Sequence, residues 1–275
     1  MIEKIAYRAR RKWRDVTTIR RPLGAGPAGQ EKISLVLYFD YEREFGNIAA
    51  KDSSETGFNA IIDILNKNAI RTTWNCVGKI SESYSKTISQ IISNGHEIAC
   101  HTYNHIEPLS TDYEKLFNDI GQFKTTFKNK YKVDVQGFHS PSDGWSKQLI
   151  EILSKHGFRY DIAVENKDQN HNACYLITTD GYLSKNTHSI LRIPSVSDDW
   201  MMISKHLEPE KMLSHWQSFL TEKYYGKTIA VGFHPWVIGK NKGRIDIFEH
   251  FIHSLQNFKD LQLFTGSEIT KWYQE

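Results

Sequence analysis

The chain has 275 residues, of which 39% are hydrophobic and 24% are charged, and its formal net charge is +3. These values are typical of a globular protein with one sizeable core, and no apolar run approaches the ~20 residues that a membrane span requires. The charge is uneven: residues 1–21 carry eight Lys or Arg against two acidic residues, a net of +6, so residues 22–275 sum to −3. A general nucleic-acid-binding protein spreads positive charge over its folded surface, and we therefore expect no nucleic-acid partner.

The basic N-terminal segment has apolar residues at roughly helical spacing, namely Ile2, Ile5, Ala9, Trp13 and Val16. An amphipathic helix of this kind favours peripheral contact of residues 1–21 with the anionic inner surface of a membrane. A solvated helix that packs on the domain is an equally good alternative. Residues 22–29 are rich in Gly and Pro and indicate a linker. We therefore predict a basic segment with its linker at 1–29 and a single folded domain at 30–275.

The chain has three widely spaced cysteines, Cys76, Cys100 and Cys174. Cys76 and Cys100 lie in apolar, strand-like segments, which favours buried free thiols in a reducing compartment. Residues 1–21 also lack the apolar h-region of a signal peptide. Both features predict a cytoplasmic localisation.

From residue 30 onward, strand-like and helix-like segments alternate. Apolar, β-rich runs predict strands at 33–39, 71–76, 97–100, 133–138, 158–162, 228–233 and 262–264. Helical patterns predict helices at 55–68, 82–93, 111–130, 146–156, 208–224, 244–258 and 267–273. This alternation predicts an α/β fold with a mainly parallel sheet, and at this length a closed or nearly closed barrel. Residues 163–206 interrupt the alternation and predict an inserted loop or hairpin.

Side chains that carry chemistry follow several of these strands, at the end of a barrel where ligands gather. Alternation places Asp40 and Glu42 on one face at the end of the first strand, where two carboxylates repel each other unless a cation relieves them. A solvated acidic loop explains the same residues. His101 and His105 follow the third strand, and one turn of helix would bring both to a single metal ion. Because the chain has twelve histidines, a chance pair also explains this spacing.

Two further histidines follow predicted strands. His139 precedes Ser140-Pro141-Ser142 at the end of the fourth strand, and His234 precedes Pro235-Trp236 at the end of the strand at 228–233. Each histidine alone is more often structural than catalytic. Acidic residues and histidines at four strand ends together predict a shared site at one rim of the barrel.

The order of these segments resembles the polysaccharide deacetylases of the NodB-homology superfamily (carbohydrate esterase family four) over roughly residues 33–274. Phe39-Asp40-Tyr41-Glu42 resembles the first motif, in the variant with one residue between the two acids. The second motif, His-Ser/Thr-x-x-His, is matched by His101-Thr102-Tyr103-Asn104-His105. The remaining similar segments are Gly137–Ser142 at the place of the third motif, Gly157–Asp161, Phe233–Trp236 and Thr265–Ile269.

The resemblance implies a distorted, incomplete (β/α) barrel of about seven parallel strands that binds one divalent metal ion, most often zinc. The ligands would be Glu42, His101 and His105. Asp40 would be the general base, His234 would protonate the departing amine, and the backbone N–H of Ser142 would stabilise the oxyanion. The corresponding catalytic set also includes Asp161 and His139.

The implied reaction removes an N-acetyl group from an amino sugar, so the predicted partner is an N-acetylated saccharide. A cytoplasmic enzyme favours a precursor of a cell-surface polysaccharide as the substrate. His139 replaces the arginine that normally pairs with the base, and the first motif is Asp-x-Glu. A metal-independent hydrolase of cyclic amides (ureides or imides) and a catalytically inactive carbohydrate-binding relative therefore stay as alternatives. The residues expected to stack on sugar rings or to lie in the core are Trp145, Trp200 and Trp236.

Overall fold

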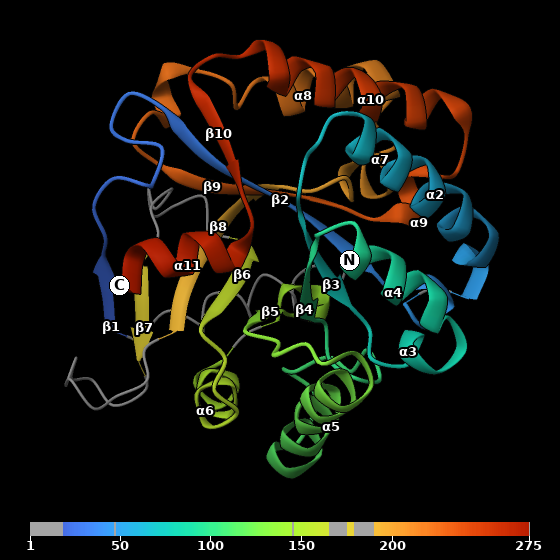
Figure 1. Ribbon diagram of the computed structural model, residues 1–275, viewed down its shortest axis with the longest axis vertical. Helices are drawn as coiled ribbons and strands as arrows, with labels where there is room; N and C mark the ends of the chain where they lie inside the picture. Colours follow the sequence, from blue (N-terminus) through green and yellow to red (C-terminus); the bar gives the residue numbers. More distant parts are fainter. Residues whose placement is uncertain (1–18, 47, 145, 165–174, 179–189, 275) are drawn as a thin grey trace.

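The computed structural model describes residues 19–46, 48–144, 146–164, 175–178 and 190–274 (Figure 1). The strands are β1 (Ile19–Pro22), β2 (Ile33–Tyr41), β3 (Thr73–Cys76), β4 (Glu97–Cys100), β5 (Gly137–His139), β6 (Tyr160–Val164), β7 (Tyr175–Thr178), β8 (Ile190–Ser197), β9 (Thr228–Phe233) and β10 (Leu261–Phe264). The helices are α2 (Lys51–Lys67), α3 (Ile80–Ser83), α4 (Ser85–Ser93), α5 (Tyr113–Tyr131), α6 (Lys147–Lys155), α7 (Met201–Ser204), α8 (Pro209–Gln217), α9 (Pro235–Ile238), α10 (Lys242–Asn257) and α11 (Gly266–Gln274).

Seven parallel strands form a closed barrel in the order β2, β3, β4, β5, β6, β8 and β9, with β9 pairing again with β2. This confirms the predicted α/β barrel of about seven strands, one fewer than in an eight-stranded (β/α) barrel. The ring is irregular where β8 meets β9, because the register shifts between Ser195 and Ser197. Helices surround the strands, with α2 and α4, α5 and α6, and α8 and α10 on successive sides of the view in Figure 1.

The predicted insert at 163–206 contains a barrel strand. The expected hairpin is present, since β7 pairs with β8 in antiparallel fashion, but β8 also lies between β6 and β9 in the ring. Its sequence includes the buried Arg192 and Pro194, residue types that are uncommon in central strands and that hide the apolar pattern. The strand predicted at 262–264 lies outside the ring, where β10 extends the edge of β2 beside residues 33–36.

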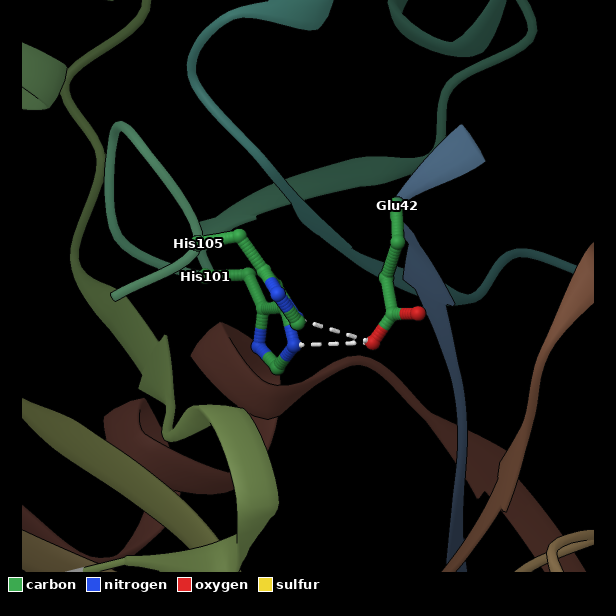
Figure 2. A group of neighbouring side chains, drawn as sticks. All are labelled: Glu42, His101 and His105. Carbon is green, nitrogen blue, oxygen red and sulfur yellow. Dashed lines mark hydrogen bonds and ion pairs between the residues drawn. The ribbon is translucent and has the colours of Figure 1, made fainter. Parts of the chain in front are cut away.

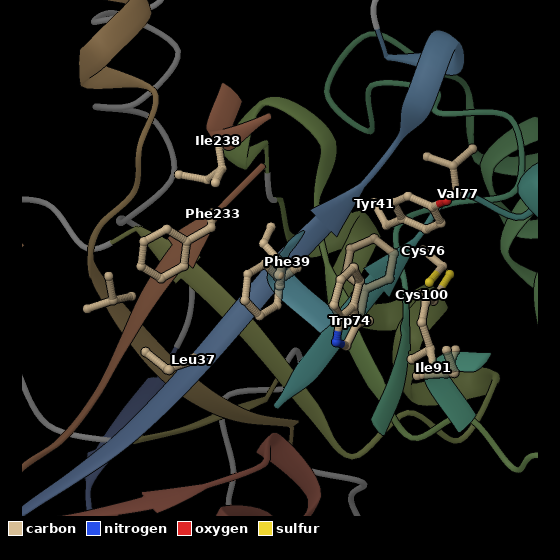
Figure 3. Close-up of a cluster of buried hydrophobic side chains, with 14 of the residues drawn as sticks. Leu37, Phe39, Tyr41, Trp74, Cys76, Val77, Ile91, Cys100, Phe233 and Ile238 are labelled. Carbon is tan, nitrogen blue, oxygen red and sulfur yellow. The ribbon is translucent and has the colours of Figure 1, made fainter. Parts of the chain in front are cut away.

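Alternation along β2 sorts its side chains into two cores. Leu37, Phe39 and Tyr41 face the outer helices, where Phe39 stacks on Trp74 with 4.6 Å between ring centroids (Figure 3). Tyr38 belongs to the smaller cluster inside the barrel, together with residues of β6, β8 and β9. Because successive side chains of a strand point to opposite faces, Asp40 shares the inner face with Tyr38.

No helix among the described residues is both long and apolar enough to cross a membrane. The predicted amphipathic segment falls mostly on residues 1–18, outside the described ranges. Cys76 and Cys100 are buried free thiols, as expected, and Cys174 also lies outside the described ranges.

The amino end of the barrel is joined to α11 through the Glu97 side chain. One carboxylate oxygen of Glu97 accepts from Thr73 Oγ1 at 3.0 Å and from the Ser267 backbone N–H at 3.0 Å. The other accepts from Tyr160 Oη at 2.8 Å and from the Ser267 hydroxyl. Glu97 therefore satisfies the amino terminus of α11 and ties it to three strands, a role that favours a negative charge at this helix end.

We predict that Glu97→Gln destabilises the fold although it keeps the side-chain volume. The amide group would face hydroxyl and N–H donors and leave part of this network unsatisfied, at a cost of about 1–3 kcal/mol. Urea denaturation measures this change in the free energy of unfolding. The control is Glu31→Ala, at an exposed turn position, which should change stability by less than about 0.5 kcal/mol. Equal stabilities of the two variants would contradict the role of Glu97.

Candidate active site

The predicted site residues meet at the carboxyl ends of the barrel strands. Asp40 and Glu42 lie at the end of β2, His101 follows β4, His139 ends β5 and His234 follows β9. The predicted helical turn between His101 and His105 is wrong. Residues 101–105 form a loop in which Thr102 and His105 have left-handed backbone conformations, with φ of 60° and 55°. The loop nevertheless brings both imidazoles to the same carboxylate.

Glu42, His101 and His105 converge on one point (Figure 2). Glu42 Oε1 lies 3.3 Å from His101 Nε2 and 3.1 Å from His105 Nε2. One ligand atom from each residue lies within 4.8 Å of the other two. His101 Nδ1 donates to the His139 carbonyl at 2.8 Å, so in the neutral imidazole Nε2 carries a lone pair.

Acceptor atoms that face each other in this way need a cation or a proton between them. A carboxylate oxygen and two imidazole nitrogens, with the second nitrogen of one ring held by a backbone carbonyl, are the donor set of an open three-ligand metal site. The residues therefore fit a divalent ion. In the metal-free protein, burial raises the pKa of Glu42, but hydrogen bonds from His101 and His105 outweigh it and the pKa lies well below its usual value.

Asp40 lies beside this group and is held by Asn75, which the sequence patterns did not indicate. Asn75 Nδ2 donates to Asp40 Oδ1 at 2.7 Å, and the two residues are register partners on β2 and β3. The other oxygen, Oδ2, faces His139 Nε2 at 3.3 Å and His234 Nε2 at 3.6 Å. Burial raises the pKa of Asp40, but the charges of the neighbouring imidazoles outweigh it and lower the pKa below its usual range. Asp40 is thus an ionised carboxylate.

His139 makes the contact with the base that the family resemblance assigns to an arginine. Its Nδ1 donates to the Ile162 carbonyl at 2.6 Å, which leaves Nε2 to face Asp40. Burial alone would lower the pKa of His139, but the Asp40 carboxylate outweighs it and raises the pKa to about 10. An imidazolium that donates through both nitrogens satisfies this geometry, so His139 supplies a positive charge beside Asp40.

His234 is oriented by Asp199, a fully buried residue between β8 and α7. Asp199 accepts from His234 Nδ1 at 2.6 Å and from the His234 backbone N–H at 2.8 Å. Burial lowers the pKa of His234, but the Asp199 charge outweighs it and raises the pKa well above its usual value. Asp199 follows a strand, as Glu42 does, but that strand lies in the segment 163–206, which was predicted as an insert.

Ser142 lies at the same rim in η3 (Pro141–Asp143). Ser142 and Asp143 have left-handed backbone conformations, with φ of 57° and 52°. Non-glycine residues in this region cost about 1–3 kcal/mol each and are frequent at functional sites. The turn follows His139 directly, which is consistent with the predicted role of the Ser142 backbone N–H.

Asp161 does not join this group. It is the register partner of Phe138, which packs in the outer core, so its side chain lies on the opposite sheet face from His139. There Asp161 forms a buried ion pair with Arg192, with 3.5 Å between Oδ2 and Nη2. The prediction of Asp161 as a catalytic residue is therefore wrong, because strand alternation turns it away from the site.

Aromatic side chains border His234. The Trp200 ring is 47% exposed and lies 6.4 Å from the His234 ring and 6.1 Å from the Trp236 ring, between centroids. Trp236 is buried in the main hydrophobic core, with its ring centroid 5.9 Å from that of His234. Trp145 lies outside the described residues.

The polysaccharide deacetylase family model matches residues 28–160, which include Asp40, Glu42, both histidines of the second motif and His139. Over this range, which is just under half of its length, the chain is similar to the polysaccharide deacetylase family. The peptidoglycan deacetylase of Helicobacter pylori (strain ATCC 700392 / 26695) is 25% identical over 116 residues, which make up 42% of this chain and 40% of that protein. The chain thus matches less than half of the length of this curated relative.

Solved structures share the fold of this chain. One is described as a polysaccharide deacetylase from Mycobacterium smegmatis and has a TM-score of 0.77 at 20% identity, covering 93% of this chain and 95% of that one. The Puue allantoinase has a TM-score of 0.76 at 16% identity, with coverage of 91% and 93%. At these identities the likeness shows a shared fold and no more.

We predict that Glu42→Gln and His105→Ala each abolish stoichiometric zinc binding. Each variant lacks one of the three converging ligand atoms. The dissociation constant for zinc should therefore rise more than the 10–100-fold that is typical when a residue hydrogen-bonded to a ligand is replaced. Elemental analysis and competition with a chromophoric chelator measure the loss. His253→Ala, at an exposed position of α10, is the control and should bind zinc as the unchanged protein does. Stoichiometric zinc in both ligand variants would show that the assignment is wrong.

Proposed function

We propose that this protein is a metal-dependent hydrolase that removes the N-acetyl group from an amino sugar, with zinc as the metal. The observation that carries this proposal is the convergence of Glu42, His101 and His105, with the Asp40 carboxylate and the His234 imidazole beside them. The similarity to the polysaccharide deacetylase family supports a hydrolase of carbon–nitrogen bonds other than peptide bonds.

Glu42, His101 and His105 would hold the ion. A divalent ion held there would supply Lewis-acid chemistry, polarising the amide carbonyl and favouring ionisation of a water molecule. Asp40 is ionised and presents Oδ2, so it is the proton acceptor for the attacking water. Asn75 and His139 fix the orientation of Asp40 and hold it in the ionised state.

The second proton transfer belongs to His234. An amide nitrogen must be protonated before the carbon–nitrogen bond breaks, and His234 is an imidazolium whose Nδ1–H is held by Asp199. Its Nε2–H is the proton that passes to the departing nitrogen, which gives acetate and a free amine. The Ser142 backbone N–H is the proposed donor to the oxyanion at the carbonyl.

The exposed Trp200 ring beside His234 supports a sugar substrate, because aromatic faces pack on the apolar faces of sugar rings. Within this class we propose a precursor of a cell-surface polysaccharide. This choice follows from the predicted cytoplasmic localisation and from the predicted contact of residues 1–21 with the inner membrane surface.

A second candidate is the hydrolysis of a cyclic ureide. The likeness to the Puue allantoinase, with coverage above nine-tenths of both chains, favours it, as does the Asp-x-Glu form of the first motif. The convergent Glu-His-His group favours the metal-dependent amide hydrolase over a metal-independent enzyme.

We predict acetate release from N-acetylglucosamine oligomers or nucleotide sugars by the zinc-loaded protein, and its loss on chelation. Asp40→Asn should retain zinc and lower the rate by about 10²–10⁴-fold, the usual contribution of a general base. The control is Asp246→Asn on α10, where the carboxylate forms an exposed ion pair with Lys242. Full activity of the Asp40→Asn variant would exclude Asp40 as the base. Turnover of allantoin that is insensitive to chelation would favour the second candidate.

For the N-terminal segment we predict binding to vesicles that contain anionic lipid, with an affinity that falls steeply as salt increases. Sedimentation with vesicles at low and high ionic strength measures it. Removal of residues 1–21 should abolish this binding and leave activity on a soluble substrate unchanged. Equal sedimentation of the two proteins would contradict the membrane contact.

A further inference from the structure

The loop that carries His101 and His105 is held by a carboxylate from a different element. Asp119 lies on α5 and is 5% exposed. Its Oδ1 accepts from the Tyr103 backbone N–H at 2.6 Å. Its Oδ2 accepts from the Asn104 backbone N–H at 3.2 Å and from Asn104 Nδ2 at 2.6 Å. One side chain thus binds two of the three peptide N–H groups that lie between the two histidines.

The conformation of the loop explains why it needs such an anchor. Thr102 and His105, on either side of the Asp119 contacts, both have left-handed backbones. Left-handed backbone conformations of non-glycine residues persist only where several surrounding contacts hold them. The Thr102 carbonyl accepts from the Gly78 N–H at 3.0 Å, and Thr102 Oγ1 accepts from the Ile106 N–H at 3.0 Å.

The carbonyl and N–H groups of the loop are therefore held from opposite sides. The turn after β3 binds its carbonyls, because the Lys79 N–H also donates to the Tyr103 carbonyl at 3.0 Å. Asp119 binds its N–H groups. Without the carboxylate, the Tyr103 N–H would stay buried without a hydrogen-bond acceptor. The left-handed backbone conformations of Thr102 and His105 would still be energetically unfavourable.

We propose that Asp119 is a positioning residue for the metal site: it holds the loop in the conformation in which His105 Nε2 reaches Glu42. This inference rests on the proposed function, since it assumes that Glu42, His101 and His105 hold a metal. His101 is fixed independently, through its own hydrogen bond to the His139 carbonyl. Loss of Asp119 therefore acts mainly on His105, and the metal site weakens without loss of a ligand residue.

The test compares Asp119→Asn with Asp112→Ala on the same helix. Asp112 caps the amino terminus of α5 by accepting from the Lys115 N–H at 2.9 Å, so its loss also lowers stability but leaves the ligand loop alone. We expect Asp119→Asn to raise the zinc dissociation constant by about 10-fold or more, as is typical when a residue that supports a metal ligand is replaced. We expect Asp112→Ala to leave zinc affinity unchanged. The d–d spectrum of the cobalt-loaded protein should change in Asp119→Asn alone.

A second measurement does not depend on metal. In chelator-treated protein, the backbone amides of Tyr103 and Asn104 should exchange with solvent faster in Asp119→Asn than in Asp112→Ala. Wild-type zinc affinity and an unchanged cobalt spectrum in Asp119→Asn would overturn the positioning role alone. A wild-type protein that binds no divalent ion would overturn the proposed metal-dependent function, and the positioning role with it.

Discussion

The site depends on the approach of the Glu42 carboxylate to the His101 and His105 imidazoles. Three buried or partly buried acceptor atoms converge, and they are stable together only with a positive charge between them. The structure around the site contains further unfavourable features, namely left-handed backbones at Thr102, His105 and Ser142 and the buried Asp119 carboxylate that holds Tyr103 and Asn104. The barrel provides the rigid frame in which such a loop conformation persists.

Three of the four imidazoles at the site are held in the same way. His101, His139 and His234 each use Nδ1 for a partner in the frame, respectively the His139 carbonyl, the Ile162 carbonyl and the Asp199 carboxylate. Each therefore directs Nε2 toward Glu42 or Asp40. The roles differ because the surroundings differ. His101 shares one Glu42 oxygen with His105 and suits a metal site, whereas His139 and His234 face Asp40 and carry protons.

Most of the site could be predicted from the sequence, because two features can be read from neighbouring residues. These are the alternation of side chains along a strand and the position of a residue at the end of an apolar run. Asp40, Glu42, His139 and His234 lie at strand ends, as their positions after apolar runs indicate. Asn75 and Asp199 were not indicated, since Asn75 lies inside a strand and β8 is masked by Arg192 and Pro194. Asp161 shows the converse: a motif match gave it a role that its sheet face excludes. The helical turn at 101–105 was wrong because backbone contacts from Asp119 and Gly78, distant along the chain, override the helical spacing.

The central claim is that Glu42, His101 and His105 bind one divalent ion, and anomalous diffraction from crystals of the zinc-loaded protein tests it most directly. The predicted result is a single strong peak within about 2.0–2.2 Å of Glu42 Oε1, His101 Nε2 and His105 Nε2. A peak centred on His139 or His234 instead, or a protein that holds no zinc at saturating concentration, would contradict it.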